Sequence, residues 1–67
     1  MKFDVGDTVY LKTDTKKRVK MTVVQVYSRE ACESVFNGVQ HYKCSWIDIE
    51  NGVSNIKTNT FPSKALK

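Results

Sequence analysis

The chain has 67 residues, of which 40% are hydrophobic, and its formal net charge is +4. A chain of this length buries only about 60% of the surface that its unfolded form exposes, which predicts one small domain with a thin stability margin. No apolar run approaches the ~20 residues of a membrane helix, so we expect no membrane span. Because Met1-Lys2 is followed by the polar stretch FDVGD instead of an apolar run, we expect a cytosolic chain with reduced cysteines.

The basic excess has two interpretations. A surplus of Lys and Arg, 11 against 7 Asp and Glu, can attract a polyanion. A net charge of about 2–8 is equally common on the surface of a small soluble domain. Composition therefore does not choose between a nucleic-acid partner and an ordinary solvated surface.

The first part of the chain, residues 3–12, predicts a turn and then a strand. Gly6 can adopt a positive φ, and the Asp7 side chain can bond neighbouring amides. Val9 and Leu11 then alternate with polar residues, which is typical of a half-buried strand. The polar stretch TDTKKR that follows predicts a hairpin loop.

Residues 19–27, VKMTVVQVY, predict a second strand because they are rich in β-branched residues. The adjacent Val23 and Val24 indicate either a bulge or a strand that is covered on both faces near a barrel corner. The segment 28–38 breaks the pattern. We favour strands that extend into a long hairpin here; a short helical turn, which Ser28 could cap and Gly38 could end, is the alternative.

The segment 39–50 predicts a third strand. Tyr42, Cys44 and Trp46 alternate along one apolar face, so we place that face toward the core. The next two residues, Asn51-Gly52, predict a type I′ hairpin turn, after which VSNIKTNT returns as a fourth strand.

The last segment predicts a 3₁₀ turn at Pro62 and a short fifth strand near residues 65–66. Five antiparallel strands in so short a chain favour a small all-β, SH3-like barrel, because closure removes exposed strand edges. We expect one domain over residues 1–67. The predicted core consists of Val5, Val9, Leu11, Met21, Val23, Val26, Tyr42, Cys44, Trp46, Ile56, Phe61 and Leu66.

The ordered motifs resemble the YodC-like family of small bacterial proteins, which carry a domain of unknown function. The residues that carry the resemblance are Phe3, Gly6, Asp7, Val9, Leu11, Lys12, Met21, Thr22, Val23, Cys44, Trp46, Asp48, Phe61, Pro62 and Leu66. Two features depart from the family pattern: TDTKKRVK replaces a Ser-Gly-Gly-Pro turn, and Ile47 replaces a phenylalanine. The resemblance implies a small β barrel and no particular activity.

Metal binding and catalysis are poorly supported by the residues. The only soft ligands are Cys32, His41 and Cys44, whereas a structural zinc site uses four ligands, usually in close pairs. His41 and Cys44 fall on opposite faces of a straight strand, so they cannot act together. The acidic pair Asp48 and Glu50 flanks a turn, which is typical of a solvated hairpin end. We therefore expect no enzyme, no cofactor and no metal.

A basic cluster is one candidate binding site. Its cations, which lie around a predicted hairpin tip, are Lys12, Lys16, Lys17, Arg18 and Lys20. Small barrels bind nucleic acid with basic loops and exposed aromatic rings, and Tyr10 and Tyr27 could supply the rings. So few cations predict weak, salt-sensitive binding.

Protein contact is the other candidate and the one we favour. The aromatic residues Tyr10, Tyr27 and Phe36 exceed what a small core needs, and any ring left outside would form a contact surface. Strand edges could also accept a further strand. We therefore predict a non-catalytic binding module that contacts another protein or a second copy of itself, with weak nucleic-acid binding through tip 16–20 as the alternative.

Overall fold

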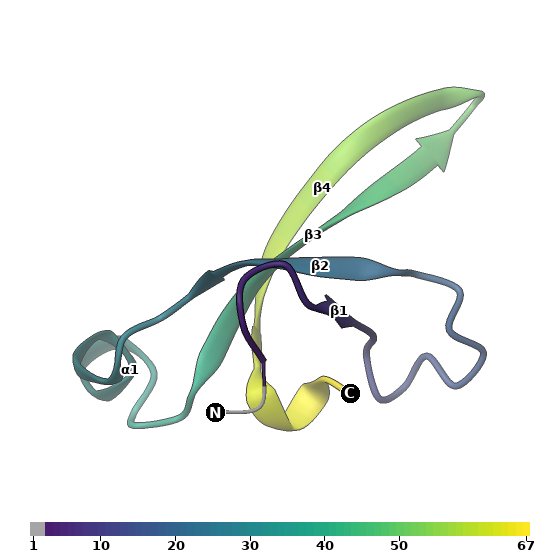
Figure 1. The fold of residues 1–67 in the computed structure, drawn as a ribbon. Helices are drawn as coiled ribbons and strands as arrows, with labels where there is room; N and C mark the ends of the chain where they lie inside the picture. Colours follow the sequence, from purple (N-terminus) through teal and green to yellow (C-terminus); the bar gives the residue numbers. More distant parts are fainter. Residues whose placement is uncertain (1–2) are drawn as a thin grey trace.

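The computed structural model describes residues 3–67 and shows an open antiparallel sheet with one short helix (Figure 1). Four strands are present in this part of the chain, in the order β1-β2-β3-β4. The strands are β1 (Thr8–Val9), β2 (Met21–Val26), β3 (His41–Glu50) and β4 (Val53–Pro62). Helix α1 (Arg29–Val35) connects β2 to β3, and the 3₁₀ helix η1 (Ser63–Ala65) follows β4.

The strand pairing confirms the predicted bulge. Val23 pairs with Cys44, and the next pair along is Gln25 with Lys43, so Val24 is the extra residue on β2. A bulge of this kind bends the strand and increases its twist. Because of the extra residue, Val26 pairs with Tyr42 and lies on the core face together with Val23, three residues earlier.

The segment 28–38 contains helix α1, so the extended hairpin favoured from the sequence is wrong. The Ser28 hydroxyl accepts a hydrogen bond from the Ala31 amide at 3.2 Å, which caps the first turn. At the other end Gly38 has φ +80° and donates its N–H to the Cys32 carbonyl at 2.9 Å. Cys32 itself is buried. Cys32 is not one of the predicted core residues, because residues 28–38 show no clear apolar face in the sequence.

The hairpin between β3 and β4 has the predicted turn. Asn51 and Gly52 both have positive φ, 52° and 77°, as a type I′ turn requires. This turn matches the right-handed twist of its flanking strands. It therefore holds the pairing from Glu50 with Val53 at the tip to His41 with Pro62 at the base.

The core lies on the inner face of the sheet. Its buried residues are Val9, Met21, Val23, Tyr42, Cys44 and Leu66, and Phe3, Leu11, Val26, Trp46 and Phe61 pack against them. Two predicted core residues are wrong: Val5 is 65% exposed and Ile56 is 78% exposed. Val5 lies in the turn before β1, and Ile56 pairs with Ile47, which places it on the face of the sheet opposite Tyr42 and Cys44.

The C-terminal residues make one bridge where we predicted a fifth strand. Leu66 pairs with Leu11, and Tyr10 and Lys67 exchange two backbone hydrogen bonds of 2.9 and 2.8 Å. The helix η1 takes up Ser63–Ala65, which limits the pairing of this segment to the single bridge at Leu66. A full fifth strand and a closed barrel are therefore not seen within residues 3–67, and the sheet is open.

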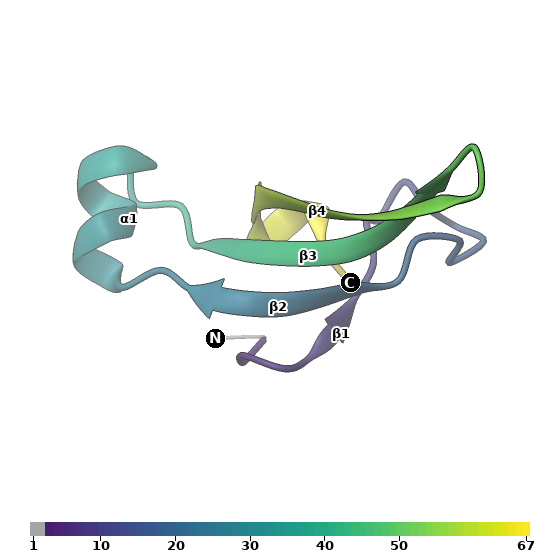
Figure 2. The same cartoon turned by 90° about the horizontal axis from the view of Figure 1, so that it is seen from above.

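The molecule is elongated, with extents of 40 × 22 × 19 Å. Its radius of gyration is 12.7 Å, against about 11 Å for an ordinary domain of this length. Its accessible surface is 4852 Å², against about 4300 Å² for a compact monomer of this mass. Figures 1 and 2 show the reason, because the tip of the β3–β4 hairpin extends beyond the body of the sheet. Across residues 3–67, the helices are too short and too polar to span a membrane.

Candidate binding groove

The projecting part of the β3–β4 hairpin, which we call the arm, consists of residues 46–57. Pairing between β2 and β3 ends at Thr22 with Ser45, whereas β3 continues to pair with β4 as far as Glu50. The arm is therefore two strands wide. Within residues 3–67, no strand pairs with Trp46–Glu50 on the side away from β4.

The backbone of the arm presents hydrogen-bonding groups on this open side. In a two-residue hairpin, the residues that flank the turn exchange both hydrogen bonds, and bonded pairs then alternate along the strands. Glu50 and Asp48 therefore direct their N–H and C=O groups toward β4. Ile47 and Ile49 direct theirs toward the open side, where no described residue of the chain accepts or donates to them.

The outer face of the arm is apolar beside this open edge. Ile47 and Ile56 are directly paired across the hairpin, so they lie on the same face, and Ile49 is two residues further along that face. These three side chains are 67%, 78% and 71% exposed, respectively. Three adjacent isoleucines exposed on a strand edge form a surface that soluble monomers normally cover or charge.

The segment Arg18–Lys20 forms the opposite wall of a groove along the open edge. Asp14 sets the position of this segment, because its carboxylate accepts the Arg18 amide at 3.1 Å and the Val19 amide at 2.9 Å. These bonds hold the pKa of the Asp14 carboxyl below its usual value, with the Val19 bond contributing most. In a longer β2, the Arg18 amide would point toward the open edge of β3. Asp14 accepts that amide instead, so β2 starts at Met21.

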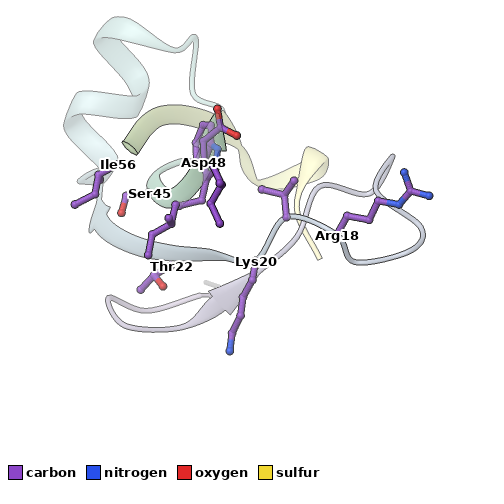
Figure 3. Close-up of a pocket in the computed structure, with 10 residues that line it drawn as sticks. Arg18, Lys20, Thr22, Ser45, Asp48 and Ile56 are labelled. Atoms are coloured by element: carbon purple, nitrogen blue, oxygen red, sulfur yellow. The ribbon is translucent and has the colours of Figure 1, made fainter. Parts of the chain in front are cut away.

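The resulting cavity, which we call the arm groove, has a volume of about 720 Å³. Its lining is mainly apolar, with two cations and one carboxylate, and consists of Arg18, Val19, Lys20, Thr22, Ser45, Trp46, Ile47, Asp48, Ile49 and Ile56. Figure 3 shows the charged ends of Arg18 and Lys20 extending away from Asp48. Neither cation forms an ion pair within residues 3–67.

The predicted basic cluster is exposed throughout, and it adjoins the arm groove. Lys12, Lys16, Lys17, Arg18 and Lys20 are all exposed. Arg18 and Lys20 line the arm groove itself. The Lys17 ammonium lies 5.5 Å from the centre of the Tyr10 ring, so one face of that ring already holds a cation.

The predicted contact aromatics lie in two separate places. Tyr10 is at the basic loop, whereas Tyr27 and Phe36 pack edge to face at 5.3 Å beside α1. Phe36 also stacks on His41 at 3.8 Å, and the Tyr27 hydroxyl is 3.2 Å from the Thr60 hydroxyl. Each ring is half-buried, so the structure does not gather the three rings into one surface.

The cysteines and acidic residues do not form a reactive centre in the described residues. Cys32 and Cys44 are both free and buried, and burial raises the pKa of the Cys44 thiol. His41 uses its Nδ1 on the Val39 carbonyl at 2.8 Å and points away from the core face. Among residues 3–67, no three His, Cys, Asp or Glu side chains gather as metal ligands would.

Comparison with protein-family models, curated proteins and solved structures finds no match for this chain. The resemblance to the YodC-like family therefore stays a prediction. The arm groove has to be interpreted from its own geometry.

The arm groove is absent from the sequence-based predictions for one main reason. The predicted core includes Ile56, so Ile47 is the only isoleucine that the prediction assigns to the outer face, and no apolar cluster is expected there. The signal is present in the sequence, because Ile47 and Ile49 alternate on the face opposite the Tyr42 and Cys44 side chains. A second apolar face on a strand indicates either a second layer of structure or a partner.

Proposed function

We propose that the protein is a non-catalytic binding module that contacts another protein through the arm groove. The observation that supports this proposal most strongly is the open edge of β3, where exposed isoleucines flank backbone groups that no described residue satisfies. A surface of this kind combines the hydrophobic centre and the polar rim that protein interfaces have.

Site-specific photo-crosslinking in a lysate of the native host tests this proposal. A photoreactive residue such as p-benzoylphenylalanine replaces Ile47 in one variant and Val35, on α1, in a matched control. The two side chains are similarly exposed, 67% and 69%. We expect discrete protein adducts from position 47 and none of the same mass from position 35. Identical adducts from both positions, or no adducts from position 47, would contradict the proposal.

A second candidate is weak binding of nucleic acid by the basic tip 16–20. It is supported by the exposure of five clustered cations and by the lack of any ion pair to them within residues 3–67. Anisotropy titrations with single-stranded and duplex oligonucleotides at low salt distinguish the candidates. Saturable binding that disappears when Lys16, Lys17 and Arg18 are changed to glutamate would favour this second candidate over the first.

Two finer predictions from the sequence also remain proposals. The bridge between Leu11 and Leu66 supports an SH3-like arrangement, because it joins the C-terminal segment to the chain that follows β1. The two free thiols support a reducing, cytosolic location.

A further inference from the structure

We infer that the open edge of β3 accepts a single extended strand from a net-acidic protein segment with β-branched residues at alternate positions. The inference rests on the proposed function and names the partner and the mode of contact. The strand would pair antiparallel, as every pair in this sheet does. Such strand addition draws affinity from backbone hydrogen bonds and specificity from alternate side chains.

The backbone geometry fixes which partner residues meet the isoleucines. Ile47 and Ile49 carry the open N–H and C=O groups, so the residues opposite them would form the hydrogen-bonded pairs. Opposite residues in an antiparallel pair also share a face of the sheet. The same partner residues would therefore donate hydrogen bonds to β3 and pack their side chains beside Ile47, Ile49 and Ile56. Short β-branched side chains fit such a flat, pleated surface.

The charge of the walls indicates an acidic partner. Arg18 and Lys20 line the arm groove without an ion pair in the described residues, and the remaining cations of tip 16–20 adjoin them. Asp48 is the one carboxylate in the lining. A segment with carboxylates beside its apolar stretch would be attracted by the net charge of +4 and oriented by the two wall cations.

A second copy of the chain fits the same edge less well. Pairing Ile47 of one copy with Ile49 of the other places the two Asp48 side chains directly opposite each other, and like charges in that position destabilise a sheet. Pairing Ile49 with Ile49 places Asp48 opposite Glu50. Pairing Ile47 with Ile47 would require Ser45, which already pairs with Thr22.

A set of short peptides tests the inference. The parent probe alternates valine with threonine and has a glutamate at each end. In one control the valine amides are N-methylated, and in a second the threonine amides are N-methylated. We expect the parent to bind, N-methylation of valine to weaken binding more than about tenfold, and N-methylation of threonine to leave binding within about threefold, because only the valine amides face β3. Replacing the terminal glutamates with lysines should also weaken binding.

Protein variants provide the matching half of the experiment. The double variant Ile47→Thr, Ile49→Thr should lose the peptide, whereas Val35→Thr should bind it normally. The exchange of the Ile47 and Ile49 amides, followed by NMR, should slow when the parent peptide is added. These variants change exposed side chains only, so circular dichroism should show an unchanged fold.

Several outcomes would overturn the inference. Equal binding of the two N-methylated peptides would show that no strand is added. If the parent peptide does not bind but position 47 still gives crosslinks, strand addition is rejected and the proposed binding module stands. If position 47 gives no crosslinks, the binding module itself is rejected. Preferential binding of oligothymidylate would assign the cations to nucleic acid. If sedimentation shows a dimer and the Ile47 and Ile49 amides exchange slowly without peptide, the open edge of β3 binds a second copy of the chain.

Discussion

Asp14 controls the arm groove at the scale of single residues. Its carboxylate accepts two successive backbone amides, from Arg18 and Val19, and so holds that segment away from β3. Lys17, between Asp14 and Arg18, has a positive φ of 52°, which is the conformation that a tight reversal of the chain requires. A local side-chain bond therefore competes with extension of β2.

The first prediction concerns the removal of this carboxylate. Asp14→Ala should free the Arg18 and Val19 amides, let β2 extend toward Ile47, and reduce binding of the valine–threonine peptide. Thr15→Ala, in the same exposed loop, serves as the control. NMR amide exchange at Lys20 and Ile47 measures the extension. Unchanged exchange and unchanged peptide binding in Asp14→Ala would contradict this role.

The second prediction concerns pH. Hydrogen bonds from the Val19 and Arg18 amides, with a smaller contribution from the nearby charges of Arg18 and Lys67, lower the pKa of Asp14 in the folded state. The bonds are therefore present above the ordinary aspartate pKa and are lost as the pH falls through the lower, folded value. Amide shifts of Arg18 and Val19 should titrate with a midpoint below that of an unperturbed aspartate. A midpoint at or above the ordinary value would show that the bonds do not form in solution.

The third prediction concerns the cysteines. Burial raises the pKa of the Cys44 thiol, and the Cys32 side chain is also buried, so neither sulfur is accessible to a reagent in the folded protein. A thiol reagent should modify both cysteines in denaturant and neither in the folded protein. Rapid labelling of native Cys44 would place it at the surface and reverse the assignment of the two faces of β3.

At the scale of elements, the arm combines a strong local turn with weak tertiary support. From the pair Trp46–Lys57 to the pair Glu50–Val53, no third strand lies beside it in the part of the chain that the structure describes. An isolated two-stranded hairpin is at best marginally stable in water, so the arm depends on its turn and on the sheet at its base. Strand addition would supply the missing third strand, which connects the stability of the arm to binding.

The fourth prediction concerns this turn. Gly52 has φ +77°, and apart from its two chain neighbours no described residue lies within 4 Å of the position that a β-carbon would occupy, so Gly52→Ala tests backbone strain alone. The left-handed conformation costs an L-residue about 1–2 kcal/mol. We expect the opening free energy from amide exchange to fall by that amount in the arm, and to fall less at Cys44 in the body of the sheet. Asn51→Gly is the control, because glycine adopts the φ of 52° at that position without strain. Equal loss of protection in both regions would mean that the arm unfolds only with the whole domain.

At the scale of the whole molecule, a small core supports a large exposed surface. Six buried side chains form its centre, and Leu66 joins it from the end of the chain through its bridge to Leu11. Phe3 approaches the same core from the other end of the described chain and packs edge to face on Tyr42 at 5.3 Å. The two ends of the chain therefore hold the inner face together, while the arm contributes little to it.

The fifth prediction compares two aliphatic residues. Leu66→Ala should lower the free energy of unfolding by about 2–5 kcal/mol, because it creates a cavity in the core. Ile56→Ala should change it by no more than about 0.5 kcal/mol, because this side chain is 78% exposed. Urea unfolding followed by Trp46 fluorescence measures both. Similar losses in the two variants would return Ile56 to the core and remove the basis of the arm groove.

Features that depend on neighbouring residues could be predicted from the amino-acid sequence. Strand alternation identified the buried face of Tyr42 and Cys44, and Asn51-Gly52 identified the hairpin. The Ser28 and Gly38 caps were signals for the helix, but its few apolar residues made an extended hairpin the favoured prediction. Each of these signals arises from local sterics or from the two-residue period of a strand, so it can be read along the chain.

Tertiary contacts decide where the pairing of β2 with β3 ends. The arm groove exists because that pairing ends before residues 46–50 of β3. The strand pattern of residues 19–27 gives no reason for pairing to end at Thr22 with Ser45. That end depends on Asp14, which accepts the amides of Arg18 and Val19. In a longer β2, the Arg18 amide would point toward β3 instead. Whether Ile56 meets the core or water is decided by the register between β3 and β4, because its pairing with Ile47 places it on the face opposite Tyr42 and Cys44.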